Sequence, residues 1–287
     1  MQLHFTKMEG LGNDYVYVNC LQQKIENPKK LAVQISDRHF GVGADGLILI
    51  KASGRADFMM DMYNADGSRS EMCGNGIRCV GKYVYDYGLT DKDAVSIETL
   101  AGIKHLKLGI DGKTADDRGN VCRVTVDMGQ PVLNPADIPV AVSDKWDILL
   151  DYPMKIERKE YRITCVSMGN PHCVIFVDDV DKVPLEELGP RFEYDTMFPN
   201  RVNVEFVQIV NRTCVRMRVW ERGTGETLAC GTGACAAVVA GILNGFLMNE
   251  TTVILRGGNL TIRWDREKNP VYMTGPANTV FDGVIEV

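Results

Sequence analysis

The sequence has no apolar run long enough to cross a bilayer, no cluster of lysines and arginines, and no CxxC motif. A membrane-spanning helix needs about 20 consecutive apolar residues. The first ten residues, MQLHFTKMEG, also lack the basic and apolar stretches of a secretory signal. Acidic residues outnumber basic ones by 38 to 32, whereas proteins that bind nucleic acid usually carry a basic surplus. We therefore expect a cytoplasmic protein that binds neither membranes nor nucleic acid.

Cysteine occurs nine times, but without the spacing of a disulfide framework or a zinc site. An odd number of cysteines in a chain without a signal peptide argues against structural disulfides. The four histidines, at positions 4, 39, 105 and 172, stand far apart. We therefore expect no metal, and we expect most of the thiols to be small buried apolar groups.

The chain is long enough for two domains of ordinary size. It has 287 residues, and a typical domain has about 150. Apolar residues make up 45% of the sequence and charged residues 24%, which is the balance of a globular protein with a substantial core.

The pattern CGxG occurs twice, 157 residues apart, at Cys73 in EMCGNG and at Cys230 in LACGTG. The same offset relates further positions: Gly12-Asn13 and Gly169-Asn170, Tyr15 and His172, Asp45-Gly46-Leu47 and Val202-Asn203-Val204, Asn64 and Glu221, Gly88 and Gly245. A constant offset without gaps over residues 12–88 indicates an internal duplication.

Both halves show the same order of expected elements. In each half a strand, a short helix and two further strands precede the CGxG motif, and an apolar helix and two strands follow it. We expect the apolar helices at residues 77–87 and 234–244, with Gly88 and Gly245 as capping glycines. The pattern predicts a mixed α+β fold of two pseudo-symmetric domains. Each domain would be a curved, mostly antiparallel sheet wrapped around a central buried helix.

The duplication also suggests where the domains begin and end. We expect one domain over residues 1–127 and the other over residues 128–275, with a proline-bearing crossover near residues 127–139. Residues 276–287 have strand character and are expected to return to the first domain.

The two repeated cysteines stand directly before the two expected buried helices. The N-terminus of a helix presents free N–H groups and positive potential, which lowers the pKa of a cysteine. The backbone N–H groups of the residues after each cysteine also form a cradle for an anion. We interpret this as a site in which one thiolate removes a proton from a carbon and one thiol delivers a proton to its opposite face. The bound anion would be the carboxylate that stabilises the developing charge.

Several motifs resemble the signatures of diaminopimelate epimerases. They are KMEGLGND at residues 7–14, NADGS at 64–68 before CGNGIR at 73–78, GNPH at 169–172, and ERGTGET at 221–227 before ACGTG at 229–233. These motifs occur in the family's order and cover nearly the whole chain.

The resemblance implies an enzyme that interconverts LL- and meso-2,6-diaminopimelate for lysine and peptidoglycan synthesis. It implies a homodimer that uses neither pyridoxal phosphate nor a metal. Cys73 and Cys230 match the catalytic acid/base pair, and His172 and Glu221 match groups that tune their pKa values. The positions that match substrate-binding residues are Asn13, Gly46, Asn64, Gly74, Asn75, Asn170, Asn203, Glu221, Arg222, Gly231 and Thr232. Some members have a glutamine in place of Gly46, and a glycine offers only its backbone.

Two other functions remain open at this point. The first is a racemase acting on proline or hydroxyproline, whose substrates have no second charged head and would not need Arg222 or the asparagines. The second is a binding protein without chemistry, built on the same duplicated frame. Arg78 is expected to pair locally, and Cys79 and Cys235 are expected to pack inside their helices.

Overall fold

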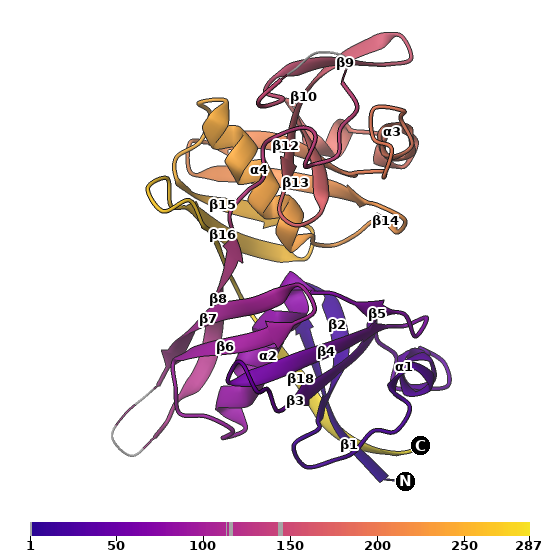
Figure 1. Cartoon of the computed structure of the whole chain (residues 1–287), viewed down its shortest axis with the longest axis vertical. Coiled ribbons are helices and arrows are strands. Elements are labelled where there is room, and N and C mark those ends of the chain that lie inside the picture. Colours follow the sequence, from indigo (N-terminus) through magenta and orange to yellow (C-terminus); the bar gives the residue numbers. More distant parts are fainter. Residues whose placement is uncertain (1, 113, 115–116, 143–145) are drawn as a thin grey trace. The chain divides into compact units, whose positions relative to one another are not determined.

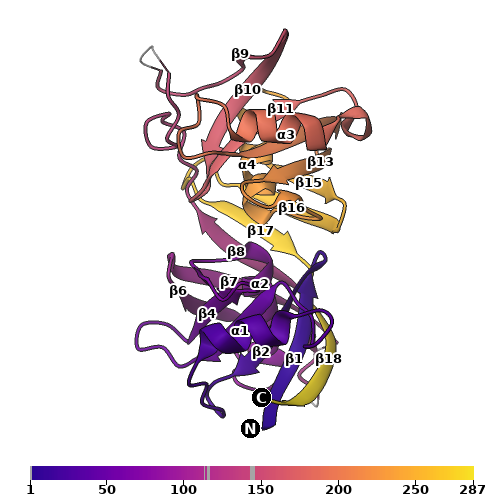
Figure 2. The same ribbon diagram turned by 90° about the vertical axis from the view of Figure 1, so that its right-hand side faces the viewer.

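A computed structural model of the chain describes residues 2–112, 114, 117–142 and 146–287 (Figures 1 and 2). The chain divides into two compact units. Unit 1 comprises Met1–Asp127 and Thr274–Val287, and unit 2 comprises Met128–Met273. Among the described residues, no helix is both long enough and apolar enough to cross a membrane.

Unit 1 is built on strands with mostly antiparallel pairing. Its elements are β1 (Gln2–Gly10), β2 (Asn13–Asn19), α1 (Pro28–Ser36), β3 (Gly46–Lys51), β4 (Phe58–Asn64), β5 (Arg69–Ser70), α2 (Gly74–Asp86), β6 (Ala94–Thr99), β7 (Gly102–Asp111), β8 (Asn120–Gly129) and β18 (Asn278–Glu286). The pairs β2–β3 and β4–β6 are parallel. The pairs β1–β18, β1–β2, β3–β4, β4–β5, β6–β7 and β7–β8 are antiparallel.

Unit 2 repeats this arrangement. Its elements are β9 (Tyr152–Ile156), β10 (Lys159–Ser167), β11 (Pro171–Phe176), η1 (Val180–Lys182), α3 (Leu185–Glu193), β12 (Asn203–Asn211), β13 (Cys214–Glu221), β14 (Gly225–Glu226), α4 (Gly231–Leu243), β15 (Glu250–Leu255), β16 (Gly258–Trp264) and β17 (Val271–Gly275). The pairs β11–β12 and β13–β15 are parallel. The pairs β9–β10, β10–β11, β12–β13, β13–β14 and β15–β16 are antiparallel.

The strand register repeats as well. Tyr15 on β2 pairs with Gly46 on β3. His172 on β11 pairs with Asn203 on β12, and both positions are shifted by the same 157 residues. The predicted architecture of two duplicated domains of mostly antiparallel strands is therefore confirmed.

Each unit contains one central helix. Figure 1 shows α2 lying among the strands of unit 1 and α4 among those of unit 2. Helix α2 packs against β1, β2, β7 and β18, and α4 packs against β10, β11, β12, β15 and β16. Nearly every side chain of α4 is buried, which agrees with its apolar sequence. Gly88 and Gly245 follow these helices with φ of 72° and 76°, so both have the predicted left-handed capping conformation.

Helix α2 is less apolar than expected because it carries Arg78. This side chain is fully buried. Its Nε donates to the carbonyl of Pro276 over 3.0 Å, and its Nη1 donates to that of Gly74 over 3.1 Å. The contact with Gly74 is the expected local one, whereas the contact with Pro276 ties the first turn of α2 to the distant segment before β18.

The outer helices α1 and α3 cover strands on one apolar face. Leu31 and Ile35 of α1 join a core cluster with residues of β1, β2 and β3. Leu185 and Phe192 of α3 join the corresponding cluster of unit 2. The spacing of these residues places them on one side of each helix. Figure 2 shows α1 in front of the strands of its unit.

The sequence patterns missed strands β1, β5, β8, β9, β10, β14 and β17. Strand β1 is held between β2 and β18, so its pairing depends on a segment from the far end of the chain. The expected return of the last segment to the first domain is confirmed, because Gln2 pairs with Glu286. Helices α2 and α4 begin at Gly74 and Gly231, three residues earlier than expected. The glycine motif thus forms the first helical turn rather than a loop.

Candidate active site

In unit 1, Cys73 lies at the N-terminus of α2. It is the N-cap residue, and its Sγ accepts a hydrogen bond from the backbone N–H of Gly76 over 3.4 Å. Its thiol donates to Asn13 Oδ1 over 3.2 Å. Asn13 opens β2 directly after a turn in which Leu11 and Gly12 have φ of 58° and 81°. The turn between β1 and β2 thereby delivers the Asn13 amide to the helix terminus.

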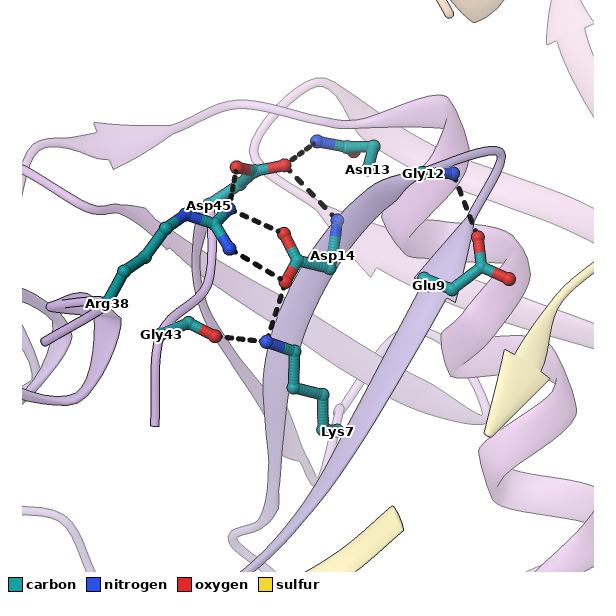
Figure 3. Close-up of polar contacts among 8 residues, drawn as sticks. All are labelled: Lys7, Glu9, Gly12, Asn13, Asp14, Arg38, Gly43 and Asp45. Atoms are coloured by element: carbon teal, nitrogen blue, oxygen red, sulfur yellow. Dashed lines mark hydrogen bonds and ion pairs between the residues drawn. The ribbon is translucent and has the colours of Figure 1, made fainter. Parts of the chain in front are cut away.

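The other end of the Asn13 amide joins a charged network (Figure 3). Asn13 Nδ2 donates to Asp45 Oδ2 over 2.8 Å. Arg38 Nη2 bridges Asp45 and Asp14, with 2.9 Å to each carboxylate, and Lys7 Nζ lies 2.7 Å from Asp14. Burial alone would raise the pKa of Asp14, but its hydrogen bonds to Arg38 and Lys7 outweigh this and lower it. The network therefore holds two aspartate side chains, paired with Arg38 and Lys7, behind Asn13.

Gly46 and Asn64 lie beside each other at the ends of β3 and β4. Asn64 Nδ2 donates to the hydroxyl of Ser68 over 2.9 Å. A Cβ added to Gly46 would overlap the carbonyl oxygen of Tyr63 and approach Tyr15 Cε1 to 2.7 Å. The space that a glutamine would need at this position is therefore filled, and Gly46 offers only its backbone.

In unit 2, Cys230 is the N-cap residue of α4 and is only 5% exposed. Its Sγ lies 3.5 Å from Thr232 Oγ1. Burial, followed by the charges of Glu221 and Glu205, raises the pKa of Cys230 well above its usual value. The expectation that the helix N-terminus lowers the pKa is therefore wrong for Cys230, because desolvation and two carboxylates outweigh the helix.

A buried histidine and carboxylate lie in the same unit as Cys230. His172 and Glu205 are both fully buried, with Nδ1 2.7 Å from Glu205 Oε1. His172 Nε2 lies 3.0 Å from Asn170 Oδ1. Because an amide oxygen only accepts, the ring donates from Nε2 to Asn170 and faces the Glu205 carboxylate with Nδ1. Among the described residues, none forms a hydrogen bond with the other carboxylate oxygen of Glu205.

Sequence reasoning missed Glu205. In the sequence, Glu205 is only a single acidic residue within the apolar strand segment NVEFV. An exposed position on the strand would account for such a residue equally well. Burial raises the pKa of Glu205, while His172 opposes that rise. A carboxylate at a position where alternation predicts the core is the feature that could have drawn attention to it.

The second glycine of each CGxG motif allows a strand to pack against the N-terminal end of the helix. A Cβ on Gly76 would lie 2.8 Å from Ile48 Cδ1, and one on Gly233 would lie 2.6 Å from Glu205 Oε1. The same added Cβ at Gly233 would lie 3.3 Å from Cys230 Sγ. The glycine thus brings the Glu205 carboxylate close to the Cys230 thiol.

The loop that carries Arg222 is braced from two sides. Asn203 Oδ1 accepts the backbone N–H of Arg222 over 3.0 Å, while Asn203 Nδ2 donates to the carbonyl of Pro171 over 2.9 Å. The buried Glu193 accepts the N–H of Gly223 over 2.9 Å. Asn203, expected to contact the substrate, holds this loop with its amide oxygen and β11 with its amide nitrogen.

The expected site residues fall into two groups, one in each unit. Unit 1 holds Asn13, Gly46, Asn64, Cys73, Gly74 and Asn75. Unit 2 holds Asn170, His172, Asn203, Glu221, Arg222, Cys230, Gly231 and Thr232. In the part of the chain that the structure describes, no three His, Cys, Asp or Glu side chains gather in a way that could hold a metal ion.

Two solved structures illustrate the similarity of this fold to that of known proteins. A phenazine biosynthesis protein of the PhzF family from Bacillus anthracis matches with a TM-score of 0.70 and 16% identity, over 100% of both chains. A hydroxyproline epimerase from Agrobacterium vitis matches with a TM-score of 0.67 and 15% identity, over 99% of this chain and 91% of that one. At such low identity these matches show a shared fold and nothing further.

Sequence comparison is more specific. A family model described as diaminopimelate epimerase matches residues 5–134 and 164–280. Diaminopimelate epimerase of Acetivibrio thermocellus is 56% identical over 286 residues, covering 99% of both chains. That of Methanococcus maripaludis is 53% identical over 285 residues, covering 99% of this chain and 100% of the relative. That of Leptospira biflexa is 51% identical over 287 residues, covering 100% of both chains. This chain therefore belongs to the diaminopimelate epimerase family.

Proposed function

We propose that this chain interconverts LL- and meso-2,6-diaminopimelate in lysine and peptidoglycan precursor synthesis, without pyridoxal phosphate or metal. Full-length identity of 51–56% to diaminopimelate epimerases supports this activity. The observation that carries the proposal is the repeated cysteine, which in each unit is the N-cap of a buried central helix.

In the proposed mechanism, Cys73 and Cys230 act on opposite faces of one α-carbon. One thiolate removes the α-proton while the other thiol supplies a proton from the far side, which inverts the centre. The substrate α-carboxylate would accept hydrogen bonds from backbone N–H groups of the two helix N-termini, namely those of Gly74, Asn75, Gly231 and Thr232. These donors stabilise the charge that spreads into the carboxylate more strongly in the transition state than in the ground state.

Cys230 is the proposed resting thiol. Burial and the carboxylates of Glu221 and Glu205 raise the pKa of Cys230, so it holds its proton at neutral pH. In the direction of the reaction in which Cys230 donates a proton to the α-carbon, Cys73 acts as the base. His172 and Glu221 take the predicted role of tuning the two cysteines.

The second, unreacting amino-acid head of the substrate is proposed to bind at the Arg222 loop. A guanidinium group matches a carboxylate with two parallel hydrogen bonds. Asn64 and Asn170 can donate and accept, so they suit the ammonium and carboxylate groups of the substrate. The bracing of the loop by Asn203 and Glu193 supports this assignment, because it restricts the backbone from which Arg222 extends.

The decisive test is turnover of LL-diaminopimelate in deuterated buffer by the reduced protein. We expect meso-diaminopimelate with one solvent deuterium at the inverted α-carbon, measured by chiral chromatography and mass spectrometry. trans-4-Hydroxy-L-proline serves as the comparison substrate and is expected to remain unchanged. Turnover of hydroxyproline alone would identify the racemase alternative, and absence of any deuterium uptake would identify a binding protein.

We further propose that the protein acts as a cytoplasmic homodimer. The support is an exposed apolar surface on β18, where Val280 is 54% and Val284 is 55% exposed. Light scattering coupled to size exclusion should give about twice the 31.9 kDa of one chain. A mass equal to one chain across micromolar concentrations would contradict the dimer.

A further inference from the structure

The two asparagines related by the internal repeat are held by opposite ends of their amides. In unit 1, Asn13 donates through Nδ2 to Asp45 over 2.8 Å. In unit 2, Asn170 accepts through Oδ1 from His172 Nε2 over 3.0 Å. Because an amide has one accepting oxygen and one donating nitrogen, the two side chains present different groups. Asn13 presents its oxygen, and Asn170 presents its NH2.

We propose that Asp45 is a positioning residue that holds the Asn13 amide with its oxygen toward Cys73 and the substrate. The inference rests on the proposed function, because it assigns a role within the same reaction. Asp45 does not itself touch the reacting atoms and acts through Asn13.

Asp45 is well placed to fix this orientation. Its Oδ2 also accepts the backbone N–H of Asp14 over 3.2 Å, and its Oδ1 is paired with Arg38 at 2.9 Å. Its own backbone N–H donates to the carbonyl of Asp14 over 2.7 Å. Figure 3 shows the Asp45 carboxylate between Arg38 and the start of β2. A carboxylate only accepts, so the Asn13 nitrogen must face it.

The repeat explains why the two units differ. The position equivalent to Asp45 is Val202, which cannot accept a hydrogen bond, and the position equivalent to His172 is Tyr15. Unit 2 therefore orients Asn170 through His172 on β11. Unit 1 orients Asn13 through Asp45, which directly precedes β3.

Opposite orientation suits the chemistry of an α-amino acid. The α-carbon carries an ammonium group, which only donates, and a carboxylate, which only accepts. The oxygen of Asn13 suits the ammonium group of the reacting centre, and the NH2 of Asn170 suits the carboxylate of the unreacting head. Before substrate binds, the thiol of Cys73 donates to Asn13 Oδ1. An amide turned the other way would donate to the sulfur and favour the thiolate.

The test replaces Asp45 in the full-length protein and follows Cys73 directly. Asp45→Val introduces the residue found at the equivalent position of unit 2, Val202, and removes the carboxylate that accepts from Asn13. Asp45→Asn retains an accepting oxygen for Asn13. Asp57→Val is the matched control in the same unit, where Asp57 accepts from Ser96 and Lys92. Circular dichroism and melting curves verify folding, and Asp45→Ala replaces Asp45→Val if the latter unfolds.

The first readout is the pH dependence of Cys73 alkylation by iodoacetamide, with peptide mass spectrometry separating it from the other cysteines. Two titratable groups that interact with Cys73 stay neutral in this range, because burial raises the pKa of Tyr17 well above its usual value and that of Cys79 to about 12. We expect alkylation of Cys73 at neutral pH to become about threefold to tenfold faster in Asp45→Val, since one pKa unit is a factor of ten. Asp45→Asn and Asp57→Val should match the wild type.

The second readout is steady-state epimerisation. Asp45→Val should raise KM for diaminopimelate about tenfold, the loss expected for one hydrogen bond to a charged group, with a smaller change in kcat. Asp45→Asn should restore KM. The proposal would be overturned if the rate of Cys73 alkylation stayed unchanged in folded Asp45→Val. It would also be overturned if Asp45→Asn or Asp57→Val increased that rate as much as Asp45→Val. If the wild type does not turn over diaminopimelate, the proposed function fails, while the alkylation series still decides the role of Asp45.

Discussion

At the scale of single residues, the same CGxG motif produces two thiols in different surroundings. Cys73 contacts the Asn13 amide, whereas Cys230 is buried near Glu205 and Glu221, which raise its pKa together with burial. The motif identifies both cysteines from sequence. The contrast between them arises from side chains on neighbouring strands and loops, such as Asn13, Glu205 and Glu221, and strand pairing decides how far these side chains lie from the sulfur.

Replacing either repeated cysteine should abolish inversion. Cys73→Ser and Cys230→Ser each remove a proton carrier from one face, and general acid–base groups contribute about 10²–10⁴-fold to a rate. We expect a loss of at least this size in kcat, measured as meso-diaminopimelate formed from the LL isomer. Cys122→Ser, at an exposed cysteine, is the control and should retain full activity. A single variant of Cys73 or Cys230 with normal kcat would contradict the two-base mechanism.

Glu205→Gln should make Cys230 easier to ionise. The Glu205 carboxylate is one cause of the raised pKa of Cys230, so removing its charge lowers that pKa. Alkylation of Cys230 by iodoacetamide should therefore begin at lower pH than in the wild type, with a rate at mildly alkaline pH about threefold higher or more. Glu226→Gln removes a carboxylate that pairs with Arg218 in the same unit and should leave the profile in place. If the pH dependence of Cys230 alkylation is unchanged in Glu205→Gln, the Glu205 charge does not affect the pKa of Cys230.

At the scale of secondary-structure elements, packing of the central helices on their strands depends on glycine. Gly76 and Gly233 lie in the first turns of α2 and α4, where a side chain from β3 or β12 occupies the space of a Cβ. The glycine-rich sequence predicted a loop before each helix, because glycine is a poor helix former. Tertiary contact outweighs that preference, and both helices begin at the residue after the cysteine.

Gly76→Ala should destabilise the protein although alanine is the better helix former. The gain in helix propensity is about 1 kcal/mol, but the new methyl group would lie 2.8 Å from Ile48 Cδ1, and overpacking a core costs about 1–3 kcal/mol. Urea unfolding should show a net loss, and Ile48→Val in the same chain should recover part of it by removing the atom in conflict. Gly54→Ala is the control, because nothing lies near its Cβ position. A more stable Gly76→Ala protein would refute the packing argument.

At the scale of the whole molecule, the two units share an order of parallel and antiparallel strands that follows the 157-residue repeat. Unit 1 is completed by β18, which pairs along the length of β1. The repeat made the duplicated architecture predictable. It did not reveal β1 as a strand, because the partners of that strand come from both ends of the chain.

Several buried thiols should make the folded protein sensitive to alkaline pH. Burial raises the pKa of Cys79 to about 12 and that of Cys173 well above the usual value. Below the usual thiol pKa, these thiols are protonated in both the folded and the unfolded chain, so their ionisation does not reduce the free energy of unfolding. As pH rises toward the folded-state values, only the unfolded chain loses protons, so stability falls by about 1.4 kcal/mol per pH unit for each such thiol.

Urea unfolding at mildly and strongly alkaline pH measures this loss. The unfolding midpoint should fall steadily above about pH 9. Cys79→Ala should show a smaller decline than the wild type, although its stability at neutral pH is lower. A midpoint independent of pH in this range would show that the buried thiols ionise equally in both states.

The sequence by itself determined the duplicated architecture, the central helices, the two repeated cysteines and the family, because each is encoded by local patterns or by a constant spacing. Only the tertiary structure decided that Glu205 faces His172 and that Asp45 orients Asn13. It also decided that Gly46 is closed to a side chain by Tyr15 and Tyr63. These contacts join residues on different strands or on neighbouring loops. Hydrogen-bond direction and burial exist only once pairing has brought such side chains together.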